Sequence, residues 1–151
     1  KNNQRKLKEF IVCIALVVEI ASCGSNKDNI LQTLKGAWSG SNTIEITMTD
    51  STGNTIIQQL VAPMEIEYAA DSTFTAVITI NDTTLIKMGG VVSYTDTLIS
   101  MTGTMATHTN MDITGEVIFS DDATISLTYN GTAPDVNVSH KGFVTAVRKA
   151  K

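Results

Sequence analysis

Apolar and polar side chains alternate along most of this chain after residue 40. The clearest stretch has apolar residues on one face of a strand and two glutamates on the other: Leu60, Ala62, Met64, Ile66 and Tyr68 against Glu65 and Glu67. Such period-two alternation is typical of β-strands that bury one face. Asx and Gly residues at 50–54, 71–72, 81–82 and 121–122 separate the stretches, as in tight turns. The pattern predicts an all-β domain without a helix beyond Leu34.

Eight or nine strands fit this pattern, and links of hairpin length join them. Gly89-Gly90 is expected to end one short strand before another begins at Val91. Pro63 predicts an edge or a bulge in the second strand, because proline has no backbone N–H to donate. A continuous meander of this size closes most simply into an antiparallel up-and-down barrel, which removes the sheet edges. A two-sheet β-sandwich is the alternative.

The N-terminal residues follow a different pattern. Four basic residues lie within 1–8, an apolar run covers 10–18, and Ile20-Ala21-Ser22-Cys23 follows. This order resembles the signal peptide and lipobox of bacterial lipoproteins. The resemblance implies a cleaved signal peptide at 1–22, lipid on Cys23, a tether at 23–29 and a β domain at 30–151. The apolar run is shorter than the about 20 residues that cross a bilayer as a helix.

Two features of this segment leave an alternative open. Glu19 places a charge between the apolar run and the lipobox, and the chain begins at Lys1 rather than Met. We therefore expect that the natural start lies upstream of Lys1. The alternative is an uncleaved N-terminal anchor or a buried helix in which Cys23 occurs by chance.

The charge and the cysteine content of the domain limit the kinds of partner that it can bind. The chain has 11 basic and 15 acidic residues, of which four basic and two acidic ones precede Cys23. The part from Cys23 onward therefore has 7 basic and 13 acidic residues, a formal charge of −6. A chain with this charge is a poor match for nucleic acid, which needs clustered Lys and Arg. Attachment to a membrane would come from the lipid alone. Beyond Cys23 there is no cysteine for a disulfide or a metal, so the domain depends on its apolar core.

Gly36-Ala37-Trp38 follows a short helical turn and opens the first strand, and Arg148 follows the last one. These residues resemble the Gly-x-Trp signature of lipocalins and the arginine that closes their barrel. The resemblance implies that Gly36, Trp38 and Arg148 close one end of a lipocalin-like barrel, as in the divergent domains of small bacterial lipoproteins. The middle lipocalin motif, Thr-Asp-Tyr, is absent, so the resemblance covers both ends of the domain but not its centre.

A search for catalytic groups finds little. His108 and His140 are the only histidines, and His140 is expected to be exposed because it lies beside Lys141. Two histidines do not make a catalytic zinc site. Glu65 and Glu67 could imitate a glycosidase pair, but a solvated outer face explains them better. No Gly-x-Ser-x-Gly or phosphate-binding glycine loop is present. We therefore expect no enzymatic activity, no metal and no cofactor.

The interior of an eight-stranded barrel holds side chains or one small ligand. Large apolar residues are expected to line it: Met48, Met64, Tyr68, Phe74, Tyr94, Met101, Met105, Met111 and Phe119. Methionine side chains adapt to ligands of varied shape. We therefore expect a lipid-anchored protein of the cell envelope, in the outer membrane, whose barrel binds a small apolar ligand. The alternative is a structural or interaction protein of the envelope with a filled core and no ligand.

Overall fold

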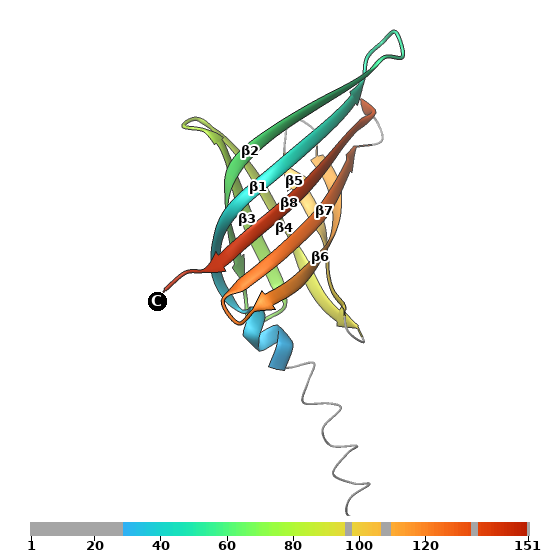
Figure 1. Ribbon diagram of the computed structural model, residues 1–151. Helices are drawn as coiled ribbons and strands as arrows, with labels where there is room; N and C mark the ends of the chain where they lie inside the picture. Colours follow the sequence, from blue (N-terminus) through green and yellow to red (C-terminus); the bar gives the residue numbers. More distant parts are fainter. Residues whose placement is uncertain (1–28, 96–97, 107–109, 134–135, 151) are drawn as a thin grey trace, which may run out of the picture. The chain divides into compact units, whose positions relative to one another are not determined.

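The computed structural model describes residues 29–95, 98–106, 110–133 and 136–150, and its strands form one closed barrel (Figure 1). Residues 29–34 are helical. The barrel belongs to the unit Leu34–Lys151. The eight strands, in chain order, are β1 (Gly36–Thr49), β2 (Thr55–Tyr68), β3 (Thr73–Asn81), β4 (Thr84–Thr95), β5 (Leu98–Ala106), β6 (Asn110–Asp121), β7 (Thr124–Ala133) and β8 (Val138–Arg148).

Each strand pairs antiparallel with the next one in the chain, and β1 also pairs with β8. The closing ladder runs from Trp38 opposite Arg148 to Met48 opposite Val138. This pairing confirms the predicted all-β up-and-down barrel and excludes the two-sheet sandwich, in which the first and last strands need not meet.

The strand count is eight because Gly89 and Gly90 do not interrupt a strand. Both lie within β4, so the predicted break there is wrong. A Cβ atom on Gly90 would collide with the backbone of Thr102 and Gly103 on β5. The glycine therefore lets two neighbouring strands approach closely, a common use of glycine in barrels.

The alternation predicted from the sequence defines the inside of the barrel. On β2, Ala62, Met64, Ile66 and Tyr68 are buried while Glu65 and Glu67 are exposed.

Side-chain oxygens stabilise the turns between strands. Asp50 accepts hydrogen bonds from Thr52 and Asn54, and these bonds hold the pKa of Asp50 at about 2. Asx residues favour turns for this reason.

The β1–β2 hairpin extends beyond its neighbours at one end of the barrel (Figure 1). β1 and β2 are paired over their whole length, from Gly36 opposite Tyr68 to Thr49 opposite Thr55. In contrast, β2 pairs with β3 only over Met64–Tyr68. Pro63 lies immediately outside that short ladder, which confirms the predicted edge position. Near the hairpin tip Ile56 and Ile57 are both exposed, because the hairpin has no covering layer there.

Candidate functional site

Trp38 closes one end of the barrel. Its side chain is fully buried, and its indole N–H donates a 2.8 Å hydrogen bond to the carbonyl oxygen of Leu34. The guanidinium carbon of Arg148 lies 4.3 Å from the centroid of the indole ring, so the predicted contact is present. Phe119 meets the same ring edge to face, with 6.3 Å between centroids. The predicted end closure is therefore built from an aromatic pair and a cation.

Gly36 and Arg148 complete this end. Gly36 has a φ angle of +123°, which side-chain-bearing residues rarely adopt, and a Cβ there would lie 3.4 Å from Nη1 of Arg148. Nη1 donates a 2.8 Å hydrogen bond to the carbonyl oxygen of Lys35. The glycine of the Gly-x-Trp motif is thus required by the backbone turn that brings the chain into β1.

A polar chain crosses the barrel interior where the first and last strands meet. Nδ2 of Asn42 on β1 donates a 2.8 Å hydrogen bond to the hydroxyl of Tyr129 on β7. That hydroxyl lies 3.2 Å from Nε2 of His140 on β8. Burial raises the pKa of Tyr129 to about 12 and lowers the pKa of His140 to about 4, so both side chains are neutral at pH 7.

The position of His140 corrects the prediction that it is exposed. Only 2% of its surface is accessible. It shares the inward face of β8 with Gly142, Val144 and Ala146, whereas Lys141 points outward. Alternation counted back from Val144 would have placed His140 inside; its charged neighbour gave the wrong indication because adjacent residues of a strand face opposite sides.

Gly142 makes room for this polar chain. It lies opposite Tyr129 in the β7–β8 ladder. A Cβ atom on Gly142 would collide with the ring and hydroxyl oxygen of Tyr129. Because Gly142 has no side chain, the tyrosine ring crosses β8 and its hydroxyl reaches Asn42 on β1.

A cavity of about 550 Å³ occupies the barrel end opposite Trp38. Its lining comes from the ends of β1, β4, β5, β6 and β8 that meet there, and from residue 136. The lining residues are Ile46, Met48, Thr84, Leu85, Ile86, Ala106, Met111, Val136, Val138 and His140. Apart from Thr84 and His140 they are apolar. A concave apolar site of this size with few polar groups is the usual form of a small-molecule site.

Two of the nine residues predicted to line a ligand site, Met48 and Met111, lie at this cavity. Five others are buried in the packed interior: Met64, Tyr68, Phe74, Met101 and Met105. There the hydroxyl of Tyr68 donates to the sulfur of Met101 at 3.5 Å, and burial raises the pKa of Tyr68. Phe119 packs on Trp38, and Tyr94 lies on β4 opposite Ile99, toward the closed end. None of these seven residues is among those that line the cavity.

Four inward-facing residues line the cavity although the sequence analysis did not predict them as lining: Ile46, Ile86, Val138 and His140. Each lies near a strand end at the open end of the barrel. Their shared level along the barrel axis follows from the register of the strands, for example Ile46 opposite His140. The sequence prediction selected large apolar side chains, and these lie at different heights along the barrel axis.

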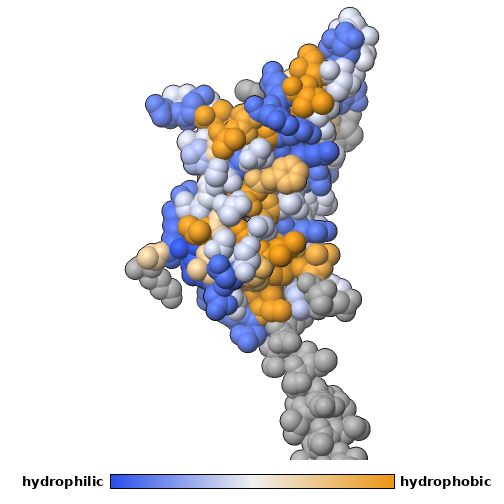
Figure 2. Space-filling model, in the orientation of Figure 1, coloured by the Kyte–Doolittle hydropathy of each residue, from blue (hydrophilic) through white to orange (hydrophobic). Residues whose placement is uncertain are grey.

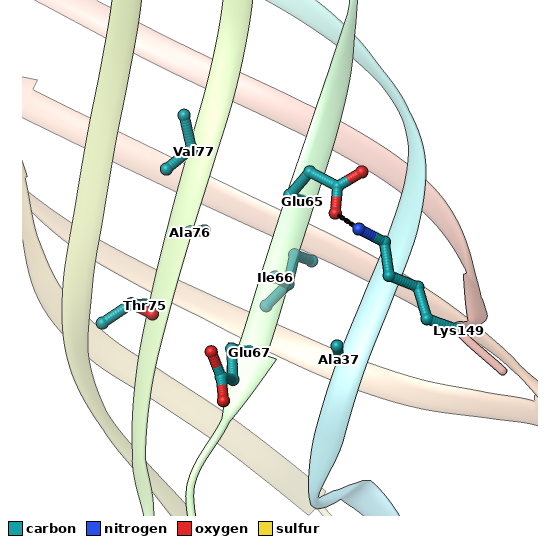
Figure 3. A pocket seen from close by; sticks show the side chains of 8 residues that line it. All are labelled: Ala37, Glu65, Ile66, Glu67, Thr75, Ala76, Val77 and Lys149. Carbon is teal, nitrogen blue, oxygen red and sulfur yellow. Dashed lines mark ion pairs between the residues drawn. The ribbon is translucent and has the colours of Figure 1, made fainter. Parts of the chain in front are cut away.

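Glu65 and Glu67 lie on the outer wall, beside a shallow depression of about 230 Å³ (Figure 3). The carboxylate of Glu65 points to the ammonium of Lys149, with which it forms an ion pair, while Glu67 points away (Figure 3). The hydrogen bond from Lys149 lowers the pKa of Glu65. Both members of the ion pair are about half exposed, so it is a solvated surface contact.

Several predicted features lie outside the described residues: Cys23, the segment 1–22, most of the tether and His108. Among the residues that the structure does describe, no three His, Cys, Asp or Glu side chains cluster as metal ligands. Within the same ranges no helix has the length and apolar character needed to span a membrane.

Of the comparisons with known proteins, only the one with solved structures finds a similarity to this chain. No protein family matches the chain, and no curated protein is found to be related to it in sequence. Among solved structures the chain is similar to a redesigned β-barrel, at 20% identity and a TM-score of 0.41, over 80% of this chain and 95% of that one. The assignment of this protein as a closed eight-stranded antiparallel β-barrel rests on its own strand pairing.

Proposed function

We propose that this protein is a binding module of the cell envelope, which holds a small apolar ligand in the cavity at the open end of its barrel. The observation that carries the proposal is the cavity itself, about 550 Å³ in volume and lined mainly by apolar side chains. Met48 and Met111 give it walls that adapt to the shape of a ligand. Burial of apolar ligand surface would provide the binding free energy, at about 25 cal/mol per Å².

The resemblance of the chain to divergent lipocalin-like domains of bacterial lipoproteins supports the same function. It rests on Gly36, Trp38 and Arg148, which meet at the closed end of the barrel. The resemblance also supports attachment of the module to the outer membrane through a lipid on Cys23. The membrane would then be one partner of the protein and the apolar ligand the other.

A displacement titration tests the binding function. We expect an environment-sensitive naphthylamine probe to bind to the chain from residue 24 onward and to be displaced by medium-chain apolar molecules. Val138→Phe should obstruct the cavity and weaken binding at least tenfold, because Val138 is part of the lining. Val147→Phe is the matched control, since it makes the same change on the exposed face of the same strand.

Equal binding by the wild type and Val138→Phe would place the ligand elsewhere and overturn the proposal. If the wild type binds no apolar probe, the binding function fails as well. The alternative, an interaction protein without a ligand, then has one feature in its favour: exposed apolar residues on the outer wall, such as Phe143 and Ile118. In the view of Figure 2 apolar side chains form separate patches among polar ones on this wall.

Lipid attachment has its own test. The full chain, expressed with an initiator methionine, should incorporate a labelled fatty acid and sediment with membranes. Cys23→Ala should abolish both, whereas Cys13→Ala should change neither, because these are the only two cysteines in the chain. Undiminished labelling of Cys23→Ala would refute the lipobox interpretation and leave the binding function unaffected.

A further inference from the structure

One polar group in the cavity is buried more deeply than the others. His140 lines the cavity and is only 2% exposed, whereas the other polar lining residue, Thr84, is exposed. Its Nε2 faces the hydroxyl of Tyr129 at 3.2 Å. The described part of the chain offers no hydrogen-bond partner for the other ring nitrogen, Nδ1. Nδ1 is not among the enclosed unpaired atoms of the described residues, so it remains accessible from the cavity that His140 lines.

The hydrogen bonds around Tyr129 determine which nitrogen of His140 carries the proton. The tyrosine oxygen accepts from Nδ2 of Asn42, and the hydroxyl has one proton to donate. With Nδ2 of Asn42 directed at the hydroxyl, a donation from Nε2 of His140 to the same oxygen would leave the tyrosine proton without an acceptor. The arrangement that satisfies the hydroxyl runs from Asn42 to Tyr129 to Nε2. The neutral ring then carries its proton on Nδ1.

The cavity also lacks a positively charged side chain that could bind an anionic ligand. No Lys or Arg is among the residues that line it. Burial lowers the pKa of His140 to about 4, so the ring is neutral at pH 7. The deep end of the cavity thus offers one neutral N–H donor in an apolar environment and no positive charge.

We propose that His140 selects ligands in which an apolar chain ends in a neutral hydrogen-bond acceptor, such as a ketone or ester carbonyl, and that its Nδ1–H donates to this oxygen. The inference rests on the proposed binding function and specifies its ligand class. A hydrocarbon of the same shape would leave the N–H without a partner. A carboxylate would lose its hydration without gaining a cation, so it should bind less well than a ketone.

The test compares three probes of equal chain length: 2-octanone, octane and octanoate, at pH 7. We expect 2-octanone to displace the naphthylamine probe at a concentration roughly three- to tenfold lower than octane, the contribution of one neutral hydrogen bond. Octanoate should bind more weakly than 2-octanone. In nitrogen-15 spectra of the histidine rings, His140 should be the Nδ1–H tautomer, and its Nδ1 resonance should shift with 2-octanone but not with octane.

The chain has only two histidines, so His108→Gln identifies the His140 signals without touching the cavity lining. His140→Asn places an amide N–H near the position of Nδ1 and should retain the preference for the ketone, whereas His140→Phe should abolish it. An Nε2–H tautomer, or equal binding of ketone and octane, would overturn the inference while leaving the binding function intact. Failure of all three probes to bind would overturn both.

Discussion

Trp38 and His140 are both almost fully buried, but the two ends of the barrel that they mark differ in how their interiors are filled. Around Trp38, the indole N–H and Nη1 of Arg148 each donate a hydrogen bond, and the ring of Phe119 packs against the indole. Beyond His140, the strand ends surround a cavity of about 550 Å³. The same alternation of apolar and polar residues therefore builds a sealed end and an open one.

The lengths of the strand ladders account for part of this difference. β1 and β2 pair over 14 residues each, but β2 and β3 pair over only five positions. At the open end the β1–β2 and β3–β4 hairpins point in different directions (Figure 1). Among the described residues, the inward side chains at these strand ends border the cavity instead of filling it. We infer that the open end is the region free to bind a ligand, while the closed end provides stability.

The largest expected effect is at the closed end. Trp38→Ala should lower the free energy of unfolding by about 3–5 kcal/mol, because it removes a fully buried ring and leaves a cavity. Urea unfolding followed by far-ultraviolet dichroism measures this, since the variant has no tryptophan left to fluoresce. Val147→Ala, on the exposed face of the same end, should cost less than about 0.5 kcal/mol. A loss below about 1 kcal/mol for Trp38→Ala would contradict the assigned closure.

The next effect concerns the pH dependence of stability at the polar chain. In the unfolded chain His140 takes up a proton near pH 6.5, but in the folded barrel only near pH 4. Its contribution to stability is therefore complete above pH 6.5 and is lost as the pH falls from 6.5 to 4. At 1.36 kcal/mol per pKa unit the total is about 3 kcal/mol.

Urea unfolding of the wild type and of His140→Phe between pH 7.5 and 4 isolates this contribution, because the carboxylates are common to both proteins. The wild type should lose more stability than the variant over that range. His108→Gln serves as the control and should follow the wild type. Parallel curves for the wild type and His140→Phe would mean that the folded barrel protonates His140 without cost.

A smaller effect is expected where Tyr129 crosses β8. Gly142→Ala should destabilise the barrel by about 1–3 kcal/mol, because the added methyl group collides with the tyrosine ring. Gly89→Ala is a suitable control, since the nearest atom to a Cβ there is 3.5 Å away, an ordinary contact. In a Tyr129→Val background the cost of Gly142→Ala should largely disappear. A cost that persists in that background would indicate that the backbone, and not the ring, requires glycine.

The smallest effect is the contact between Arg148 and Trp38. A guanidinium over an indole contributes about 0.5–2 kcal/mol. A double-mutant cycle of Arg148→Ala and Trp38→Phe should show coupling of this size by equilibrium unfolding. The parallel cycle with Lys149→Ala, whose ammonium pairs with the exposed Glu65, should show none. Equal coupling in the two cycles would exclude a specific contribution of the cation over the ring.

Much of the barrel could be predicted from local pattern. The faces of β2, the Asx turns and the positions of Gly36, Trp38 and Arg148 all follow from side-chain alternation and turn chemistry, which act between near neighbours in the chain. Pro63 marked a strand edge for the same local reason, its missing N–H. The break expected at Gly89-Gly90 was wrong because Gly90 serves a close approach to β5, a contact between strands.

The sequence by itself determined which side chains face the interior, whereas only the tertiary structure decided at which level each one lies. Met48 and Met64 both point inward, but Met48 borders the cavity and Met64 is in the packed core. The level depends on the register between strands far apart in the chain, such as Asn42 opposite Val144. The same register brings Asn42, Tyr129 and His140 together. Alternation has a period of two residues and does not distinguish registers that differ by two, so the cavity and its buried histidine emerge only when the barrel closes.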